Sequence, residues 1–353
     1  MSTPLVRTLI RTCLADPGST WTQIAAKHVQ QASHAEWQQT LLTLLVHRLV
    51  PLTTYALEQH SLLDAVPAEH LTVMRLVAQK AKTTTMLNLL TLDGILTTMQ
   101  QAGLHPVLWK GVVLADSFYP HPQTRAMDDI DFSLPPEEMS KAHDVFQSLG
   151  FIRQEQMATD DAVYYLNRLG VLCDVHHRVR LFEALDTTID SSHPLTIDFN
   201  PTHLKTRPMN VLEPNAMLVH LVVHMDGHRD ETGPLLIWML DVAFVLRRWG
   251  GLIDLERIQT LMPAPEYLIS LLRLVRFLHE ELHEPLPESL AIAAQNYPPY
   301  TLAEILRQRR LAIWGLPTWR GWVRLLGCRL GITARKNRIY PHIHDLLPWA
   351  TAS

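Results

Sequence analysis

Two aspartates separated by one residue, Asp129 and Asp131, have types and spacing that could do chemistry. They begin a stretch, residues 129–134, in which polar and apolar residues alternate, a pattern that predicts a β-strand. Side chains two positions apart in a strand project to the same face, which places the two carboxylates side by side. Neighbouring carboxylates repel each other, and a bound divalent cation stabilises them most easily. The alternative is a solvated sheet edge that happens to carry two aspartates.

A third carboxylate, Asp174, lies in a second predicted strand, residues 170–179. Positions 171, 173 and 175 are apolar and suit a core, whereas Asp174 and His176 share the opposite face. A polar face in a buried strand needs partners. If the two strands are neighbours, the three aspartates can converge on one or two Mg²⁺ ions, which hold the attacking and leaving oxygens of a phosphoryl or nucleotidyl displacement. We interpret His176 either as a substrate contact or proton relay, or as a structural histidine.

Four short motifs follow one another along the chain: Lys110-Gly111, Arg125, Asp129-Ile130-Asp131 and Asp174-Val175-His176. Together they resemble nucleotidyltransferases of the DNA polymerase β-like superfamily, and more narrowly a bacterial family of uncharacterised nucleotidyltransferases. The resemblance covers roughly residues 30–260. It implies that Asp129 and Asp131 ligate metal, and that Asp174 binds the catalytic metal or activates the incoming hydroxyl. It also implies Mg²⁺, with Mn²⁺ as a substitute, and an NTP co-substrate, for which we expect ATP.

The resemblance further implies that Lys110, Gly111 and Arg125 bind the nucleotide. The wider superfamily has a Gly-Ser pair at a helix start, where this chain has Lys110-Gly111 followed by Val112. A glycine permits close backbone approach, and N–H groups at a helix start attract phosphate. We therefore expect Lys110 to replace the missing hydroxyl contact as a cation, and Arg125 to contact a phosphate or pyrophosphate. For Arg125 the alternative is a surface ion pair with Asp128.

The hydrophobic patterns divide the chain into three regions. Residues 1–104 predict an N-terminal helical region, and residues 105–180 alternate strands and helices. Residues 181–353 predict a C-terminal helical region, in which 181–210 reads as loop and helices begin near residue 213. The sequence thus predicts an α+β fold, with a small mixed-sheet nucleotidyltransferase core at 105–180 between two helical regions.

Composition narrows the class of protein. The 353 residues are 47% hydrophobic and 19% charged, which predicts a folded chain of two or three packing units. A net charge of −4 excludes the class of proteins that are basic overall and cover nucleic acid without sequence preference. The 3 cysteines lie far apart, which argues against a disulfide framework or a cysteine-based zinc site and favours the cytoplasm. The apolar N-terminal stretch contains arginine, unlike a signal peptide, and no apolar run is long enough to predict a transmembrane segment.

Three histidines, His220, His224 and His228, recur every four residues and so line one stripe of a predicted helix. A zinc site there would lack the glutamate of a metalloprotease motif, so we favour packing behind the active-site sheet or along the substrate cleft. Asp241 lies within an apolar helical pattern. We expect its carboxylate to accept a hydrogen bond from one of these histidines or from the backbone.

The segment 305–340 is rich in arginine and tryptophan and contains no acidic residue. Such a segment could bind RNA, an acidic peptide or a membrane surface. We favour the alternative of an amphipathic helical cap, in which the tryptophans belong to the core and the arginines are solvated.

The leading hypothesis is a Mg²⁺-dependent nucleotidyltransferase that moves an NMP from an NTP to an unidentified small molecule or peptide and releases pyrophosphate. One alternative is transfer to a tRNA or another RNA, as in toxin-type relatives, for which the segment 305–340 would serve. A second alternative is a non-catalytic nucleotide- or peptide-binding protein on the same fold, which the absence of a serine after Gly111 supports.

Overall fold

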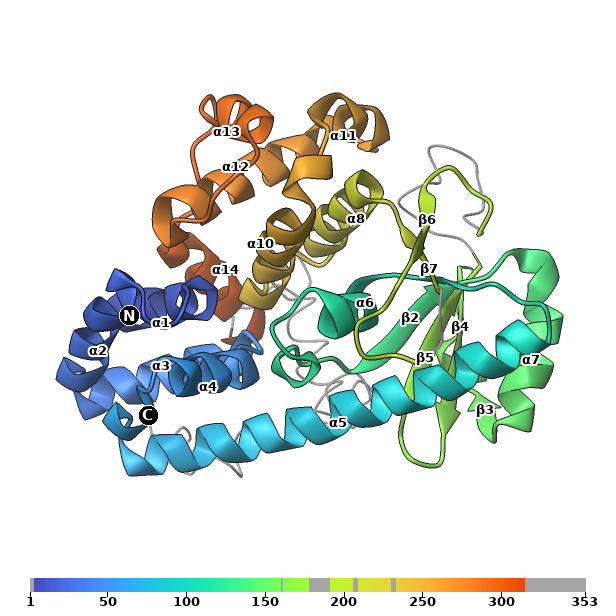
Figure 1. Cartoon of the computed structure of the whole chain (residues 1–353), viewed down its shortest axis with the longest axis horizontal. Coiled ribbons are helices and arrows are strands. Elements are labelled where there is room, and N and C mark those ends of the chain that lie inside the picture. The colour runs from blue at the N-terminus through green and yellow to red at the C-terminus, as the bar shows by residue number, and fades with distance from the viewer. Residues whose placement is uncertain (1–2, 160, 178–190, 206–208, 230–232, 315–353) are drawn as a thin grey trace. The chain divides into compact units, whose positions relative to one another are not determined.

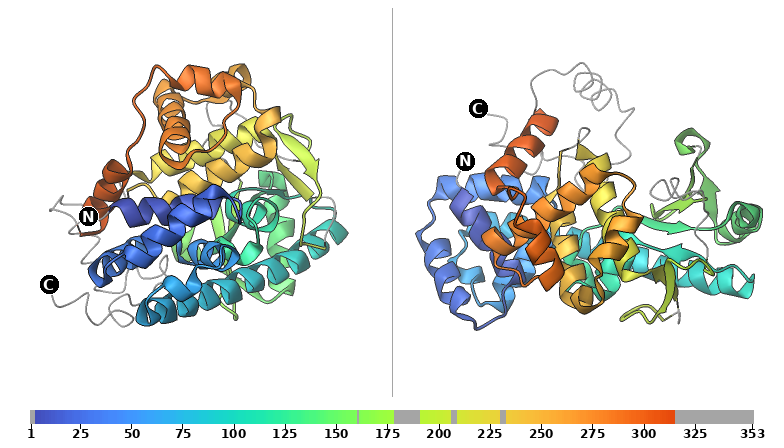
Figure 2. Two further views of the ribbon diagram at one scale, coloured as in Figure 1. Left: turned by 60° about the vertical axis from the view of Figure 1, so that its left-hand side comes forward. Right: turned by 90° about the horizontal axis from the view of Figure 1, so that it is seen from above.

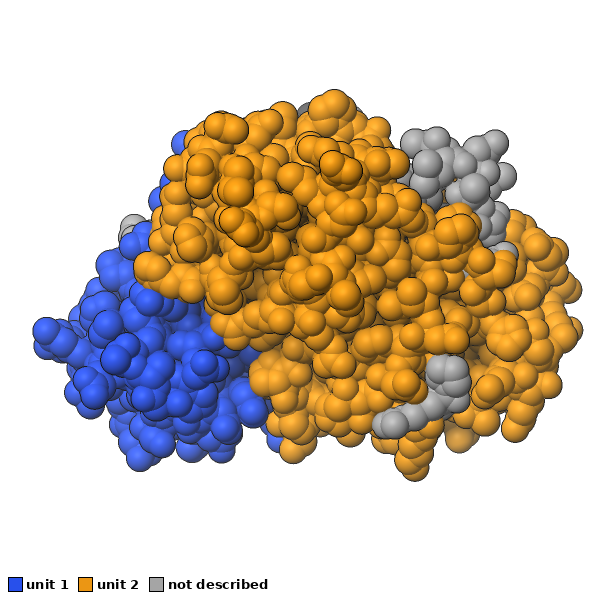
Figure 3. All heavy atoms as spheres, turned by 45° about the horizontal axis from the view of Figure 1, so that its top comes forward, with its two compact units in different colours: residues 1–81, 228–236, 301–353 blue, residues 82–227, 237–300 orange. Residues whose placement is uncertain are grey.

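The computed structural model describes residues 3–159, 161–177, 191–205, 209–229 and 233–314 (Figure 1). In this part of the chain, helices accompany a 7-stranded mixed sheet, which confirms the predicted α+β class. The chain forms two compact units (Figure 3). Unit 1 comprises residues 1–81, 228–236 and 301–353, and unit 2 comprises 82–227 and 237–300. The division into three regions along the sequence stays a prediction.

Unit 1 is helical where it is described, as the N-terminal pattern predicts. Its helices are α1 (Thr3–Leu14), α2 (Thr20–Gln31), α3 (His34–Val46), α4 (Val50–Gln59), the first part of α5 (Ala68–Gln101) and α14 (Leu302–Trp314). Helix α3 begins with a capping box, in which the Ser33 hydroxyl accepts from the backbone N–H of Glu36 and the Glu36 carboxylate accepts from the backbone N–H of Ser33. This cap determines where the first residues of α3 lie.

Unit 2 contains the whole sheet. Its strands are β1 (Val107–Leu108), β2 (Asp129–Ser133), β3 (Phe151–Arg153), β4 (Ala162–Asn167), β5 (Leu172–His176), β6 (Thr196–Phe199) and β7 (Met209–Leu212). They are ordered β3-β4-β5-β2-β1-β7-β6. The pairs β2–β5 and β1–β7 are parallel, and the other neighbouring pairs are antiparallel.

One face of the sheet is an aromatic core covered by α7 (Met139–Ser148). Phe146 of α7 stacks on Tyr165 of β4 with ring centroids 4.1 Å apart, and it also packs against Phe132 and Phe151. Because strand side chains alternate between faces, burial of Phe132 leaves Asp131 on the opposite face. The alternation read from residues 129–134 is therefore confirmed.

The prediction that residues 181–210 form only a loop is wrong for the C-terminal part of this range. Strand β6 lies within this range, and β7 begins there. Each is four residues long, which is too short for a clear period-2 pattern. Strand β7 is held by pairing with β1, about 100 positions earlier in the chain, and such long-range pairing leaves no local signal.

The remaining helices of unit 2 are α6 (Lys110–Ser117), α8 (Pro214–Gly227), α10 (Leu236–Trp249, its first residue in unit 1), α11 (Leu255–Leu261), α12 (Pro265–Leu282) and α13 (Glu288–Ala294). Helix α8 packs against α11 and α12, and α12 packs against α13 (Figure 2). Among the described residues no helix is long and apolar enough to cross a membrane. Most of the segment 305–340 lies outside the described residues.

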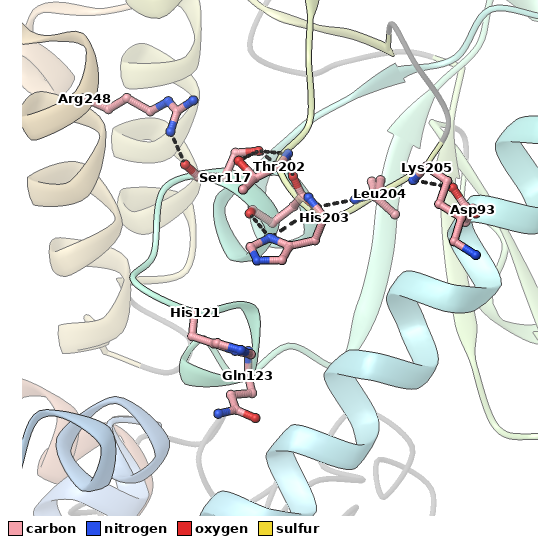
Figure 4. Close-up of polar contacts among 10 residues, drawn as sticks. Asp93, Ser117, His121, Gln123, Thr202, His203, Leu204, Lys205 and Arg248 are labelled. Atoms are coloured by element: carbon pink, nitrogen blue, oxygen red, sulfur yellow. Dashed lines mark hydrogen bonds and ion pairs between the residues drawn. The ribbon is translucent and has the colours of Figure 1, made fainter. Parts of the chain in front are cut away.

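A buried carboxylate ties the last turn of α6 (Lys110–Ser117) to the chain that leads into β7. Asp116 is fully buried and accepts hydrogen bonds from the backbone N–H groups of Thr202, His203 and Leu204, at 2.7 to 2.9 Å. The Ser117 hydroxyl donates to the same carboxylate. Figure 4 shows this segment, in which the next N–H, that of Lys205, donates to Asp93 instead. A charged acceptor with four donors is strongly stabilised, so Asp116 orders residues 202–204.

We expect Asp116→Ala to lower the free energy of unfolding by about 3–5 kcal/mol, because it removes a buried carboxylate that accepts from three backbone N–H groups. Urea denaturation measures the loss, and hydrogen exchange at residues 202–204 should accelerate. The control is Asp93→Ala, which removes one exposed acceptor and should cost under about 1 kcal/mol. Equal losses in the two variants would contradict the role given to Asp116.

Candidate active site

Three side chains lie in one row across neighbouring strands. Asp131 is the register partner of Asp174 in the β2–β5 pair, and Asp174 is the partner of Tyr164 in the β4–β5 pair. Register partners share a face, with Cβ atoms about 4.5–5.5 Å apart. Asp131 is 6% exposed and Asp174 is 8% exposed. The fold therefore brings two of the predicted carboxylates together in a largely dry environment.

Lys110 supplies the positive charge of this row. Its ammonium Nζ donates to Oδ1 of Asp131 at 3.1 Å. Burial by itself would lower the pKa of Lys110, but the charges of Asp131, Asp174 and Asp129 outweigh burial and raise this pKa. The backbone of Lys110 has a φ of 47°, in the left-handed region that non-glycine residues rarely adopt. Such strain persists where the surrounding structure imposes it, and it is frequent at functional sites.

Asp129, at the start of β2, carries the least compensated charge. Its side chain is partly exposed. Burial in the site raises the pKa of Asp129 to about 8, and the charges of Asp131, Asp128 and Asp174 act in the same direction, while Lys110 opposes them. One carboxyl group of the site therefore holds a proton near neutral pH until a further cation arrives.

His176, at the end of β5, joins the row from the side. Its Nε2 lies 3.2 Å from Oδ1 of Asp174 and 4.0 Å from Oδ1 of Asp131. Its ring makes a T-shaped contact with Trp109, with centroids 5.2 Å apart, and Trp109 also stacks on His220 at 5.3 Å. His176 thus lies within reach of both carboxylates, as the alternation along its strand predicts for Asp174.

The side chains present suit a divalent cation. The ligand atoms of Asp131, Asp174 and His176 lie within 4.8 Å of one another, and Asp129 stands outside this group while contributing its charge to it. Carboxylate oxygens are the ligands that Mg²⁺ and Mn²⁺ prefer, and an imidazole nitrogen is acceptable to Mn²⁺. His176 lies within this group and Asp129 does not, and the three aspartates expected as metal ligands stay a prediction.

Arg125 is buried, and it pairs with Asp241 of α10. Its Nε and Nη2 atoms donate to the two oxygens of Asp241 at 2.8 and 2.7 Å, and the Tyr119 hydroxyl donates to Oδ1 at 2.7 Å. The alternative of a surface ion pair with Asp128 is not what the structure contains. The prediction that a histidine of α8 or a backbone group donates to Asp241 is wrong, since Arg125 and Tyr119 donate instead.

Gly111 lies beneath the same guanidinium. A Cβ atom at this position would stand 2.9 Å from Nη1 of Arg125. The absence of a side chain is therefore required for Arg125 to pack against the first turn of α6. The expected phosphate contacts of Gly111 and Arg125 remain predictions, but the structure adds a packing reason for both residues.

Sequence reasoning did not identify Trp109 or Tyr164 as residues of this site. It also did not predict that His220 contacts Trp109. Burial raises the pKa of Tyr164, and the charge of Asp174 and a hydrogen bond to it act in the same direction. Tyr164 could have been found only from the register of β4 on β5. His220 was seen as part of a stripe, yet in the structure it contacts Trp109 and stacks near His224, 6.3 Å away.

Comparison with protein families identifies the class. The model of a family described as uncharacterised nucleotidyltransferase matches residues 33–283, well over half of the chain. The chain belongs to this family and is a nucleotidyltransferase, which confirms the resemblance carried by the four motifs. No match is found among curated proteins.

Solved structures show more distant likenesses. The solution structure of the antibiotic-resistance factor ANT(2'')-Ia is 15% identical, with a TM-score of 0.39, over 50% of this chain and 90% of that chain. A crystal structure of ANT(2")-Ia with adenylyl-2"-tobramycin is 16% identical, with a TM-score of 0.37, over 49% and 93%. An antigenic nucleotidyltransferase-like protein from Paracoccidioides brasiliensis is 12% identical, with a TM-score of 0.34, over 60% and 95%.

Asp129→Asn should change how stability depends on pH. The folded protein holds a proton with a pKa of about 8 that the unfolded chain releases near 3.8. Wild-type stability therefore falls as the pH rises from about 4 to 8, and a neutral amide escapes this loss. We expect the variant to gain about 2–4 °C in Tm over wild type at pH 8, and little at pH 5. Thermal unfolding in EDTA measures this, with the exposed Asp198→Asn as control; a gain independent of pH would contradict it.

His220→Leu should not destabilise the protein, and we expect a gain of about 1 kcal/mol. His220 is 5% exposed, and neither ring nitrogen has a hydrogen-bond partner. Burial holds the pKa of His220 well below its ordinary value, so the ring is neutral. Leucine therefore replaces a neutral ring whose two nitrogen atoms lack hydrogen-bond partners. The control is His47→Leu, because Nδ1 of the buried His47 accepts from the N–H of Leu236. Urea denaturation should show His47→Leu as destabilised, and an equal loss in His220→Leu would contradict the prediction.

Proposed function

We propose that this nucleotidyltransferase moves an NMP from an NTP, with ATP as the expected donor, to an acceptor nucleophile in a reaction that uses Mg²⁺ or Mn²⁺. The observation that carries the proposal is the register pairing of Asp131 with Asp174, with Lys110 on Asp131 and His176 on Asp174. Asp131 and Asp174 would hold the cation, with Asp129 and His176 at their side. When bound, the cation neutralises the phosphates and lowers the cost of charge that develops during displacement.

Lys110 has the position to neutralise phosphate oxygens. It begins α6, where backbone N–H groups without intrahelical partners attract anions. Its ammonium already lies among the carboxylates, so a triphosphate held by a cation at Asp131 would meet Lys110 at short range. Arg125 would act mainly on α6, because its guanidinium is engaged by Asp241 and lies against Gly111.

Asp174 and His176 are the groups suited to the acceptor proton. Asp174 would accept the proton of the attacking hydroxyl, and His176, 3.2 Å away, would carry it onward. Tyr164 holds Asp174 through a hydrogen bond and so orients it. Positioning and charge stabilisation do most of the work in such a displacement, because the protein forms no covalent bond to the substrate.

The acceptor is proposed to be a small molecule or a peptide. An RNA acceptor would require the basic segment 305–340, which lies largely outside the described residues. Salt-sensitive RNA binding would favour it. We place the enzyme in the cytoplasm, with support from Cys13 and Cys173, which are buried and free.

Asp131→Asn and Asp174→Asn should each reduce pyrophosphate release by about 1,000-fold or more, because each removes a proposed metal ligand. The assay supplies each of the four NTPs with Mg²⁺ or Mn²⁺, and reads pyrophosphate together with mass gain on candidate acceptors, including the protein itself. The matched control is Asp198→Asn, an exposed aspartate of β6, which should keep wild-type activity. Undiminished release in the Asp131 and Asp174 variants would overturn the assignment. Metal-dependent NTP binding without pyrophosphate from wild type would favour a non-catalytic binding protein.

A further inference from the structure

We propose that His34, Glu69 and His70 form a second metal site, which binds Zn²⁺ and belongs to unit 1, whereas the carboxylate row belongs to unit 2. His34 is the first residue of α3, and Glu69 and His70 lie in the first turn of α5. Among the described residues, two groups of three possible ligands have their ligand atoms within 4.8 Å of one another. One is the candidate active site, and the other is this group, to which the proposed function assigns no role.

The spacing of the three ligand atoms suits tetrahedral coordination. Oε1 of Glu69 lies 2.9 Å from Nδ1 of His34 and 3.5 Å from Nδ1 of His70. Zinc bonds of about 2.0–2.2 Å at tetrahedral angles place neighbouring ligand atoms about 3.3 Å apart. The two observed distances fall on either side of this value, so small side-chain movements would admit the ion. Two imidazoles and one carboxylate are also a ligand set that Zn²⁺ uses, with a fourth position left for water.

His70 supplies the independent sign of a missing ligand. Its side chain is only 3% exposed, and its Nδ1, which faces Glu69, has no hydrogen-bond partner. A buried ring nitrogen without a partner is costly, and a metal ion is one partner that would satisfy it. Burial lowers the pKa of His70, which keeps the ring in the neutral form that ligates metal. Trp37 and His34 pack against the ring, with centroids 6.2 and 4.9 Å away, and hold its orientation.

Two other readings of the cluster are weaker. A simple ion pair between His34 and Glu69 would account for the 2.9 Å contact, but it would leave Nδ1 of the buried His70 unsatisfied. The N-termini of two helices meet here, and their dipoles disfavour a cation. Glu36 and Glu69 in the first turns offset this effect, and solvent screens it, since Glu69 is largely exposed. A bound ion would fasten the start of α3 to the start of α5, the helix that continues into unit 2.

The test must separate this cluster from the candidate active site, since Asp131, Asp174 and His176 could also bind Zn²⁺. The parent for the experiment is therefore the full chain carrying Asp131→Asn and Asp174→Asn. Zinc titration by calorimetry, together with zinc content after dialysis against buffered micromolar Zn²⁺, is expected to show one equivalent per chain.

Adding His34→Ala or Glu69→Gln to this parent should weaken zinc binding by about 100-fold or more, because each removes a ligand atom. Both side chains are largely exposed, so both variants should fold, which circular dichroism checks. Zn²⁺ should raise the Tm of the parent and not that of either variant. The control is His105→Ala, an exposed histidine outside the cluster, which should keep the parent's affinity.

Unchanged zinc affinity in the His34 and Glu69 variants, or the absence of zinc binding in a folded parent, would overturn the proposal. His34→Ala alone should leave pyrophosphate release at the wild-type rate, because the cluster contributes no group to the proposed reaction. Failure of the zinc site and failure of the proposed function therefore give different results.

Discussion

Repulsion among carboxylates is the constraint on which the site depends. Asp131 and Asp174 are register partners on adjacent parallel strands, and Asp129 adds a third negative charge at the start of β2. Lys110 contributes one ammonium group, which pairs with Asp131. A single positive charge does not balance the negative charges of all three carboxylates. Burial raises the pKa of Asp129 to about 8, and this crowding of negative charge acts in the same direction.

Two buried carboxylates near the site, Asp116 and Asp241, are by contrast well paired. Asp241 receives three hydrogen bonds from Arg125 and Tyr119, and Asp116 receives four from its own helix and residues 202–204. These carboxylates are fully buried, where an unpaired charge would be very unfavourable. Asp116 connects the last turn of α6 to the chain before β7. Asp241 holds Arg125, whose guanidinium lies against Gly111 in the first turn of α6.

Features of the site that depend on residues close together in the sequence were predictable, and features that depend on distant residues were not. Period-2 alternation identified the shared faces of Asp129 with Asp131 and of Asp174 with His176, because that signal is local. It could not show that Asp131 and Asp174 are register partners, or that Tyr164 stands next to them, since register depends on pairing between distant segments. The same limit explains why β6 and β7 were read as loop.

Residue types, order and spacing were sufficient for the α+β class, for the family and for the group of residues that should meet at one face. Only the folded chain decided which partners each group takes. Arg125 pairs with Asp241, 116 positions away, because a buried guanidinium needs a buried carboxylate, and the sequence offers several candidates without ranking them. The fold likewise brings His34 to His70, and it brings His176 within reach of Asp131 and Asp174. Short sequence motifs identify the reactive residues, whereas the pairing of charges depends on how residues far apart in the sequence pack together.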